Sequence, residues 1–411
     1  MKLFYTFFIK LYVLGIRLAS LYNDKAKKWI EGRRDQDESW PPEQADKTRW
    51  IWLHAASLGE FEQGRPLIEA FKQTYPDQKI LLTFFSPSGY EIRKDYPLAD
   101  QIAYLPADTP KNVSRFLDGL SISIAVFIKY EFWFNYISQL LQRNIPLIFV
   151  SSRFTPNQFF FSSYGKWFLN KLQGVSCFYV QDRSSEELLR QHGISQVMVT
   201  GDTRFDRVVS LAQKTDSFPK IEAFINGRKV LVFGSTWPED ETHLFEAMKQ
   251  VPDKYCILLA PHETHEKRIR SIESTLTLSH QRYSSSSLSS DSRILIIDTI
   301  GILSQLYQYA DFAFVGGGFG KSIHNIQEPV AFGCPVIIGP HYSKFIEAVE
   351  LIQAGGVRAV ANGAQLADAI NDFIYKPDLL NRASAICIEY ARQNTGATQS
   401  IMTSIEDFMH S

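Results

Sequence analysis

The sequence has few cysteines and almost no net charge. Its four cysteines, Cys177, Cys256, Cys334 and Cys387, stand far apart and include no CxxC pair. This spacing argues against a disulfide framework or a cysteine zinc site and indicates a reducing, cytosolic compartment. Lysine and arginine number 43 against 44 aspartates and glutamates. Because the charges balance, no overall charge attracts nucleic acid, and we expect no nucleic-acid partner.

The sequence also lacks long apolar runs that are free of charge. The most apolar segment is the N-terminus, where Lys10 and Arg17 interrupt about 20 apolar residues. Each cation near the centre of a membrane span costs roughly 2.5–3.5 kcal/mol. Residues 1–34 are therefore predicted to form an amphipathic helix with a basic flank that lies in the membrane interface. A full span and a helix packed on the protein's own core are the alternatives.

Beyond residue 48, short apolar runs alternate with helical patterns in two series separated by a polar stretch at 210–228. Runs that are apolar throughout are typical of parallel strands covered on both faces. The pattern predicts an α/β fold with two doubly wound Rossmann-like domains, 48–209 and 228–395, that face a central cleft. A last helix at 396–411 could return to the first domain. Strands are expected at 50–54, 79–85, 101–105, 123–128, 146–150, 176–180, 197–200, 229–234, 255–260, 293–298, 311–315, 335–338 and 357–360.

Ligands of open α/β sheets bind beyond the carboxyl ends of the strands, so the residues that follow each strand carry the most information. Glu60 follows the first strand in HAASLGEFEQGRP. It fits a capping box with Ser57, and it also fits a partly desolvated general base. Glu131 follows another strand in KYEFWFN and is either a first-turn acid favoured by the helix dipole or a site residue. Arg153, in SSRF, suits a phosphate or carboxylate ligand or a surface ion pair.

Strand ends in the second half carry small, polar and glycine residues. Ser235 and Thr236 could meet a phosphate or cap a helix. His262 opens HETH, a spacing without a third ligand, so we expect no metal site. A longer stretch, GGGFGKSIHNIQEP, supplies glycines for close backbone approach, a possible helix cap and an acid that could bind a ribose diol. These residues are Gly317, Gly318, Asn325 and Glu328. No G-x-G-x-x-G motif is present at the first strand, which argues against a dinucleotide site.

Taken together, several of these segments resemble a known family. HAASLGEFEQGRPLIE, KYEFWFN, SSR, VTGDTRFDRV, GSTWPEDE, DTIG and HNIQEPVAFGCPVIIGPH occur in this order along the chain. They are similar to the 3-deoxy-D-manno-octulosonic acid (Kdo) transferases of lipopolysaccharide biosynthesis, which have the GT-B glycosyltransferase fold.

This resemblance implies inverting, metal-independent transfer of Kdo from CMP-Kdo to a lipid A precursor at the cytoplasmic face of the inner membrane, without a cofactor. It implies that Glu60 is the general base and that Glu131 is a second important carboxylate. It places the donor near Ser235, Thr236, Asn325 and Glu328, with His262, Gly317 and Gly318 beside them. Arg153 or Arg204 would hold an acceptor phosphate or the Kdo carboxylate.

The chain departs from the family pattern at three places. APHETHE stands where many members have Arg-His-Pro-Glu, so His262 replaces an arginine. Lys129 stands where many members carry an acid, and the glycine loop is longer than usual. Both carboxylates remain, so these departures indicate variation between lineages and not loss of activity. Two alternatives stay open: another GT-B enzyme that uses a UDP-sugar for a lipid or cell-wall precursor, or a non-catalytic membrane-surface binding protein.

Overall fold

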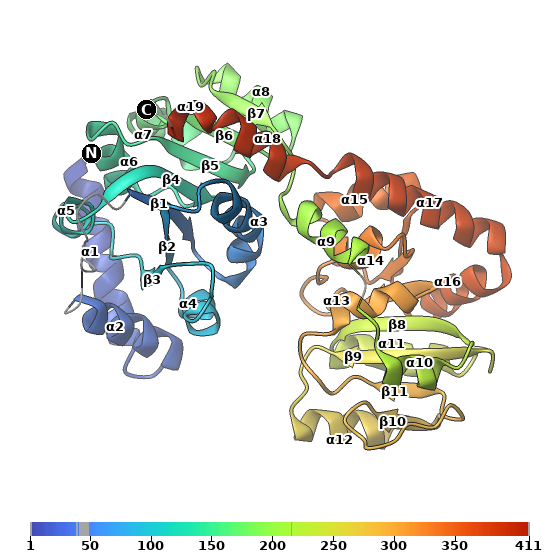
Figure 1. Ribbon diagram of the computed structural model, residues 1–411. Coiled ribbons are helices and arrows are strands. Elements are labelled where there is room, and N and C mark those ends of the chain that lie inside the picture. The colour runs from blue at the N-terminus through green and yellow to red at the C-terminus, as the bar shows by residue number, and fades with distance from the viewer. Residues whose placement is uncertain (1, 38–39, 41–48, 215, 410–411) are drawn as a thin grey trace. The chain divides into compact units, whose positions relative to one another are not determined.

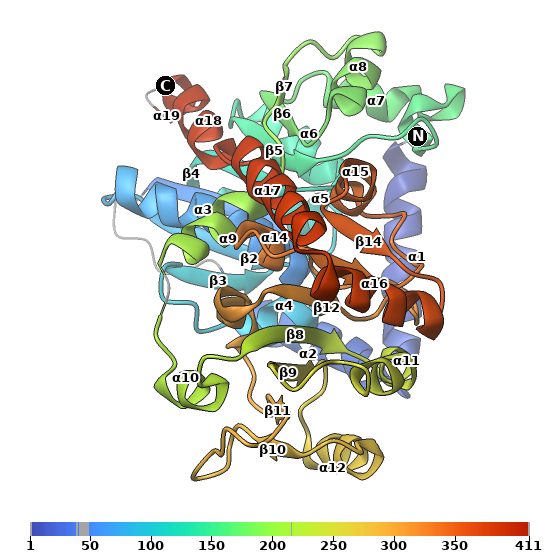
Figure 2. The same ribbon diagram turned by 90° about the vertical axis from the view of Figure 1, so that its right-hand side faces the viewer.

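The structure is a computed structural model that describes residues 2–37, 40, 49–214 and 216–409. The chain forms two compact units. The first unit comprises Met1–Asp206 together with Gly396–Ser411, and the second comprises Arg207–Thr395. Each unit holds one parallel sheet with helices packed around it (Figures 1 and 2). The predicted α/β fold with two doubly wound halves is therefore confirmed.

In the described part of the first unit, seven strands form a sheet in the order β3-β2-β1-β4-β5-β6-β7, and every neighbouring pair is parallel. The order reverses between β1 and β4, which is the topological switch point where ligands of such sheets bind. The strands are β1 (Arg49–Ala55), β2 (Lys79–Phe84), β3 (Gln101–Tyr104), β4 (Ser121–Ile128), β5 (Leu147–Ser152), β6 (Cys177–Val180) and β7 (Val197–Val199).

Helices of the first unit cover this sheet, and the C-terminal helices pack on α3 and β4. Ile401 and Ile405 enter the same apolar core as Leu53 and Val126, so the chain end contributes to the first unit's core. The helices are α1 (Lys2–Ala19), α2 (Asp24–Asp37), α3 (Leu58–Thr74), α4 (Pro87–Arg93), α5 (Pro110–Asp118), α6 (Phe134–Gln142), α7 (Lys166–Leu172), α8 (Arg183–Gln191), α18 (Ala397–Ser404) and α19 (Glu406–Met409), with 3₁₀ turns η1 (Phe159–Phe161) and η2 (Ser163–Gly165).

The second unit repeats the plan with the strand order β10-β11-β9-β8-β12-β13-β14, again all parallel in the described residues. Its switch point lies between β8 and β12. The strands are β8 (Lys229–Thr236), β9 (Tyr255–Pro261), β10 (His280–Arg282), β11 (Ile294–Ile296), β12 (Phe312–Val315), β13 (Val336–Ile338) and β14 (Val357–Ala359).

Helix α9 (Arg204–Gln213) spans the boundary between the units. The remaining helices belong to the second unit. They are α10 (Pro219–Ile225), α11 (Pro238–Met248), α12 (Glu266–Thr275), α13 (Leu303–Leu306), α14 (Gln327–Ala331), α15 (Ile346–Ala354), α16 (Gly363–Tyr375) and α17 (Pro377–Gln393), with the 3₁₀ turn η3 (Tyr307–Tyr309).

Every predicted strand is present, and the structure adds β10, which the pattern of apolar runs does not predict. β10 reads His280-Gln281-Arg282, is only half-buried and pairs with β11 alone, so it has none of the apolar residues that mark the inner strands.

Among the described residues, no single helix is both long and apolar enough to cross a membrane. By length and composition α1 and α2 meet that test only as a pair, with a bend of 118° between Leu3–Ala19 and Asp24–Gln36.

Candidate active site

The two predicted carboxylates of the first unit lie at its switch point. Glu60 follows β1 and Glu131 follows β4, the strands between which the order reverses. His54, near the end of β1, pairs in register with Thr83 of β2 and with Phe127 of β4. The sheet topology therefore gathers Glu60, Glu131 and His54 at one edge, where parallel sheets bind their ligands.

Glu60 lies in the first turn of α3 and closes a capping box with Ser57. The Ser57 backbone N–H donates to Glu60 Oε2 over 3.0 Å. Burial raises the pKa of Glu60 above its usual value, the negative charge of Glu131 raises it further, and the positive charge of Lys129 opposes both. The capping box predicted from the sequence is confirmed, and the same carboxylate has the raised pKa that suits a proton acceptor.

Glu131 is held by two neighbouring rings. His54 Nε2 lies 3.0 Å from Glu131 Oε2, and Trp133 Nε1 donates to the same oxygen over 2.7 Å. On its other side, His54 Nδ1 lies 2.9 Å from the Thr83 hydroxyl. Because an ionised carboxylate only accepts hydrogen bonds, His54 Nε2 donates to Glu131. The fully buried His54 thus fixes the orientation of Glu131.

Glu131 does not lie in a helix. Helix α6 begins at Phe134 and its N-cap is Trp133, so Glu131 lies in the turn that precedes it. The alternative that Glu131 is a first-turn acid is therefore wrong. Its carboxylate is bonded to the side chains of His54 and Trp133 instead of to backbone N–H groups of the helix.

The backbone is strained beside these carboxylates. Lys129 has φ 59° and Ser151 has φ 53°, at the ends of the neighbouring strands β4 and β5. The Ser152 hydroxyl donates to the Lys129 carbonyl over 2.8 Å and links the two strained segments. Such conformations cost of order 1–3 kcal/mol each and gather at functional sites. Strain at two adjacent strand ends agrees with a site at this edge.

The two predicted arginines of the first unit are both ion-paired. Arg153 Nε lies 3.3 Å from Asp182 Oδ2, as in the ion-pair alternative for this residue. Arg204 Nη2 lies 2.6 Å from Asp202 Oδ2. Asp202 is buried and also accepts from Gln63 at 3.0 Å, so it belongs to a hydrogen-bond network that fixes the start of α9. An anionic ligand that binds Arg153 or Arg204 would therefore share the guanidinium with Asp182 or Asp202.

In the second unit, three rings stack at the switch point. Trp237 follows β8, and its ring lies 4.6 Å from that of His262 and 24° from parallel. The ring of His262 lies 4.4 Å from that of His324, and Trp237 Nε1 donates to His324 Nε2 over 2.7 Å. Burial and the nearby His262 lower the pKa of His324 to about 4. His324 is therefore neutral at physiological pH and accepts the Trp237 hydrogen bond.

A buried carboxylate holds the glycine loop that follows β12. Asp240 Oδ2 accepts from the backbone N–H of Gly317 over 2.6 Å and of Trp237 over 2.9 Å, and Oδ1 accepts from Phe319 over 3.2 Å. Gly317 has φ 88°, a conformation that favours glycine. A Cβ at Gly318 would lie 2.8 Å from Gly339 Cα, so this glycine allows two loops to touch. Much of the glycine pattern is therefore needed by the fold itself.

The other predicted residues of the second unit differ in how accessible they are. Ser235 has φ 52° at the end of β8 and is half-buried. Thr236 is buried, and its hydroxyl donates to Glu241 over 2.8 Å. Asn325 Oδ1 accepts from the Gln327 N–H over 3.0 Å, and its amide donates to Glu328 over 3.2 Å, but the N-cap of α14 is Ile326, so the expected cap by Asn325 is wrong. Burial raises the pKa of Glu328, and the positive charge of Arg207 acts to lower it.

The second unit contains a cavity of 340 Å³ beside the stacked rings, which lies within the size range of small-molecule sites. Trp237, His324, Lys321 and the glycine loop line it. Asn325 and Glu328 are not among the residues that line this cavity. Among the described residues, no three His, Cys, Asp or Glu side chains gather as metal ligands would.

Several residues of the site were not singled out from the sequence. They are His54, Trp133, Trp237, Asp240 and His324. The signal that could have identified His54 is its place at the end of a buried strand, where a polar residue needs a partner. The partners of the others lie on distant segments, which spacing along the chain does not reveal.

Comparison with known proteins shows a consistent likeness to one family. Residues 31–207 match the family model of 3-deoxy-D-manno-octulosonic-acid transferases. The chain is 28% identical to a transferase of that name from Haemophilus influenzae over 90% of this chain and 88% of the relative. It is 26% identical to the one from Chlamydophila psittaci over 80% and 78%.

A solved structure with the same fold is the UDP-GlcNAc 2-epimerase from Neisseria meningitidis bound to UDP-GlcNAc. It has a TM-score of 0.61 and 14% identity, and the match covers 87% of this chain and 99% of that one. At this identity the likeness shows the fold alone. With two doubly wound units, paired carboxylates at the first switch point and a likeness to named Kdo transferases along most of its length, the chain is a glycosyltransferase similar to the Kdo transferases of lipopolysaccharide biosynthesis.

Proposed function

We propose that this enzyme transfers Kdo from CMP-Kdo to a lipid A precursor of the lipid IVA type, with inversion at the anomeric carbon and without a metal ion. The observation that carries the proposal is Glu60, a rigidly held carboxylate whose pKa is raised by burial and by Glu131. The relatives named Kdo transferases supply the substrate class.

In the proposed reaction, Glu60 accepts the proton of an acceptor sugar hydroxyl. The hydroxyl oxygen forms a bond to the anomeric carbon of Kdo as the bond from that carbon to the CMP phosphate breaks. The electron pair of the broken bond leaves with CMP, and a single displacement of this kind inverts the configuration. A carboxylate with a raised pKa is a better proton acceptor than one with an ordinary pKa.

Glu131 has a supporting role in this mechanism. Its negative charge raises the pKa of Glu60. His54 and Trp133 keep its Oε2 in place, so this charge is held at a fixed position. We therefore assign the proton transfer to Glu60 and the tuning of its basicity to Glu131.

For the donor, we propose a site on the second unit beside the 340 Å³ cavity, with the stacked rings of Trp237, His262 and His324 next to the cytosine ring. Ser235, Thr236, Gly317, Gly318, Asn325 and Glu328 would surround the rest of CMP-Kdo. For the acceptor, we propose the first unit, with Arg153 or Arg204 near a phosphate or the Kdo carboxylate. Residues 1–34 would hold the enzyme at the cytoplasmic face of the inner membrane.

The test is a turnover assay with CMP-Kdo and lipid IVA, together with thermal unfolding in CMP or UDP. We expect transfer of Kdo and a rise in Tm with CMP that UDP at the same concentration does not match, because a ligand stabilises the state that binds it. A larger rise with UDP and no turnover of CMP-Kdo would point to a UDP-sugar and overturn the proposal.

A further inference from the structure

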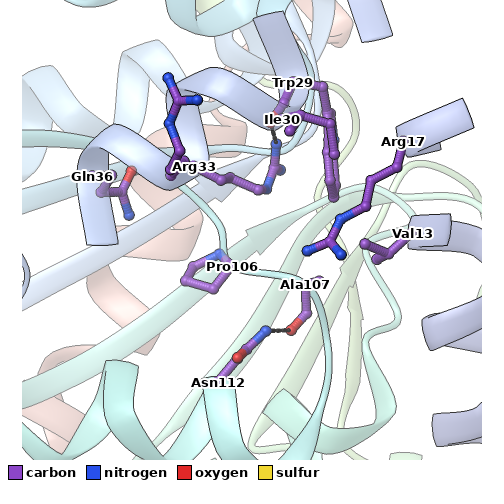
Figure 3. Close-up of a pocket in the computed structure, with 10 residues that line it drawn as sticks. Val13, Arg17, Trp29, Ile30, Arg33, Gln36, Pro106, Ala107 and Asn112 are labelled. Atoms are coloured by element: carbon purple, nitrogen blue, oxygen red, sulfur yellow. Dashed lines mark hydrogen bonds between the residues drawn. The ribbon is translucent and has the colours of Figure 1, made fainter. Parts of the chain in front are cut away.

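A second cavity lies in the first unit, away from the carboxylates at the switch point. It has a volume of 360 Å³ and is enclosed by α1, α2 and the loop between β3 and α5. Figure 3 shows Arg17 extending from α1 and Arg33 from α2 toward the same hollow, with Pro106, Ala107 and Asn112 on its far side. Arg34 also lines the cavity, and no aspartate or glutamate does.

The walls of this cavity are firmly built. Helix α2 is fixed to the edge strand by Gln36, whose amide donates to the Tyr104 carbonyl over 2.8 Å and accepts from the Tyr104 N–H over 2.6 Å. Helix α1 is fixed by the Tyr5 hydroxyl, which donates to Asp108 Oδ2 over 2.6 Å. Asp108, the carboxylate of the loop, is buried and also accepts from the backbone of Asn135. Asp108 is therefore bonded to Tyr5 and Asn135 and does not line the cavity.

Arg33 is held in place without a carboxylate. Its Nε donates to the Leu105 carbonyl over 2.9 Å and its Nη2 to the Phe85 carbonyl over 2.8 Å. Its Nη1 donates to Trp29 over 3.2 Å, and the guanidinium lies 3.7 Å from the centre of the Trp29 ring. Three of five N–H donors are used in this way, and among the described residues no ion pair neutralises the charge.

A guanidinium removed from water needs an anion. Burial lowers the pKa of Arg33 to about 9, so it is still charged at neutral pH. Arg17 lines the same hollow, is exposed, and its side chain has no partner in the described part of the chain. The planar forks of the two guanidinium groups match the oxygens of a phosphate.

The surroundings of the cavity indicate where such a phosphate comes from. Arg17 lies on α1, which leaves large apolar side chains in solvent, among them Phe4 at 67%, Phe7 at 60% and Leu18 at 60% exposed. A helix with such a face is stabilised at a membrane surface, where phosphates of lipid headgroups lie beside apolar chains. We propose that the cavity between α1, α2 and the β3–α5 loop binds the phosphate of an anionic membrane lipid through Arg17 and Arg33.

This assignment differs from general attraction to an anionic surface. A surface cation adds about 1 kcal/mol, or roughly fivefold in affinity, wherever it lies near the membrane. Arg17 lines a cavity together with Arg33, so it should add more, and its effect should depend on phosphate. Lys10 offers a matched control, because it lies on the same helix, is exposed as Arg17 is, and does not line the cavity.

The experiment measures sedimentation of the full chain with vesicles of phosphatidylglycerol and phosphatidylcholine, without donor or acceptor sugar. We expect Arg17→Gln to weaken binding about 30-fold, and Lys10→Gln to weaken it no more than the fivefold of a surface cation. Inorganic phosphate should compete for the wild-type chain more than chloride of equal ionic strength, and should not do so for Arg17→Gln.

Equal losses in the two variants would overturn the proposal, since general charge would then explain binding. If phosphate raises the Tm of the wild-type chain but not of Arg17→Gln, while both bind vesicles equally, the cavity takes a free phosphate and the lipid assignment is wrong. Because the assay involves no sugar transfer, its failure is distinct from failure of the proposed transferase reaction.

Discussion

His54 Nε2 lies 3.0 Å from Glu131 Oε2 and joins the end of β1 to the turn after β4. The bond crosses the switch point of the first sheet, where ligands of doubly wound sheets bind. His54 is itself held by the Thr83 hydroxyl of β2, at 2.9 Å. Three parallel strands therefore fix the position of one carboxylate, which in turn raises the pKa of Glu60.

The hydrogen bonds to Glu131 should matter for the rate of transfer. His54→Phe keeps a ring of similar size beside Phe127 but removes the donor to Glu131. We expect kcat to fall about 100-fold, because a small displacement of a positioned group has an effect of that size. Trp133→Phe keeps a ring against Phe85 and removes the other donor, and we expect a loss of about tenfold.

Steady-state kinetics over a range of CMP-Kdo concentrations measures kcat and KM for both variants. KM for CMP-Kdo should change little, because we place the donor on the second unit. If both variants transfer Kdo at the wild-type rate, the position of Glu131 has no part in catalysis.

The pH dependence of the reaction should report the coupling between the two carboxylates. Glu60 acts when it is deprotonated, so kcat/KM should fall as the pH drops below its raised pKa. Glu131→Gln removes a negative charge that raises this pKa, and the acid limb of the profile should therefore move to lower pH. The measurement is kcat/KM against pH for both proteins. An acid limb at the same pH, or one moved upward, would contradict the coupling.

Asp240 should stabilise the glycine loop and with it the donor site. Asp240→Asn leaves one carbonyl oxygen facing the three N–H groups of Trp237, Gly317 and Phe319. We expect the free energy of unfolding to fall by about 1–3 kcal/mol, the cost of an unsatisfied buried donor. Affinity for CMP should fall about tenfold, as calorimetry would measure.

Glu246→Gln is the matched control for Asp240→Asn. Glu246 lies on the same helix with its side chain 74% exposed. Its substitution should change the free energy of unfolding by no more than about 0.5 kcal/mol. If Asp240→Asn behaves like this control in urea unfolding and in CMP binding, Asp240 does not hold the donor site.

The strands were predictable because inner strands of a parallel sheet are apolar along their whole length. Trp52 and Leu53 of β1 and Phe127 of β4 are all buried, although they point to opposite faces of the sheet. The rule fails for β10, a polar strand at the sheet edge. Glu60 was also predictable, because the capping box that presents it is a local pattern of four residues.

Partners that lie on other segments could not be read from the sequence. Arg33 belongs to a run of basic residues that predicts a surface flank, yet its guanidinium bonds the carbonyls of Leu105 and Phe85. Asp240 looks like an ordinary first-turn acid, yet it holds a loop more than seventy positions away, at Gly317. In both cases the fold brings together groups whose separation along the chain carries no signal.

Glu60→Gln tests the central claim most directly. Glutamine preserves the capping box, so the variant should unfold with nearly the same Tm as the wild type, and CMP should raise that Tm equally. With CMP-Kdo and lipid IVA as substrates, we predict that kcat falls about 10²- to 10⁴-fold, the usual contribution of a general base. A folded Glu60→Gln enzyme that transfers Kdo at a rate close to that of the wild type would contradict the assignment of Glu60 as the base.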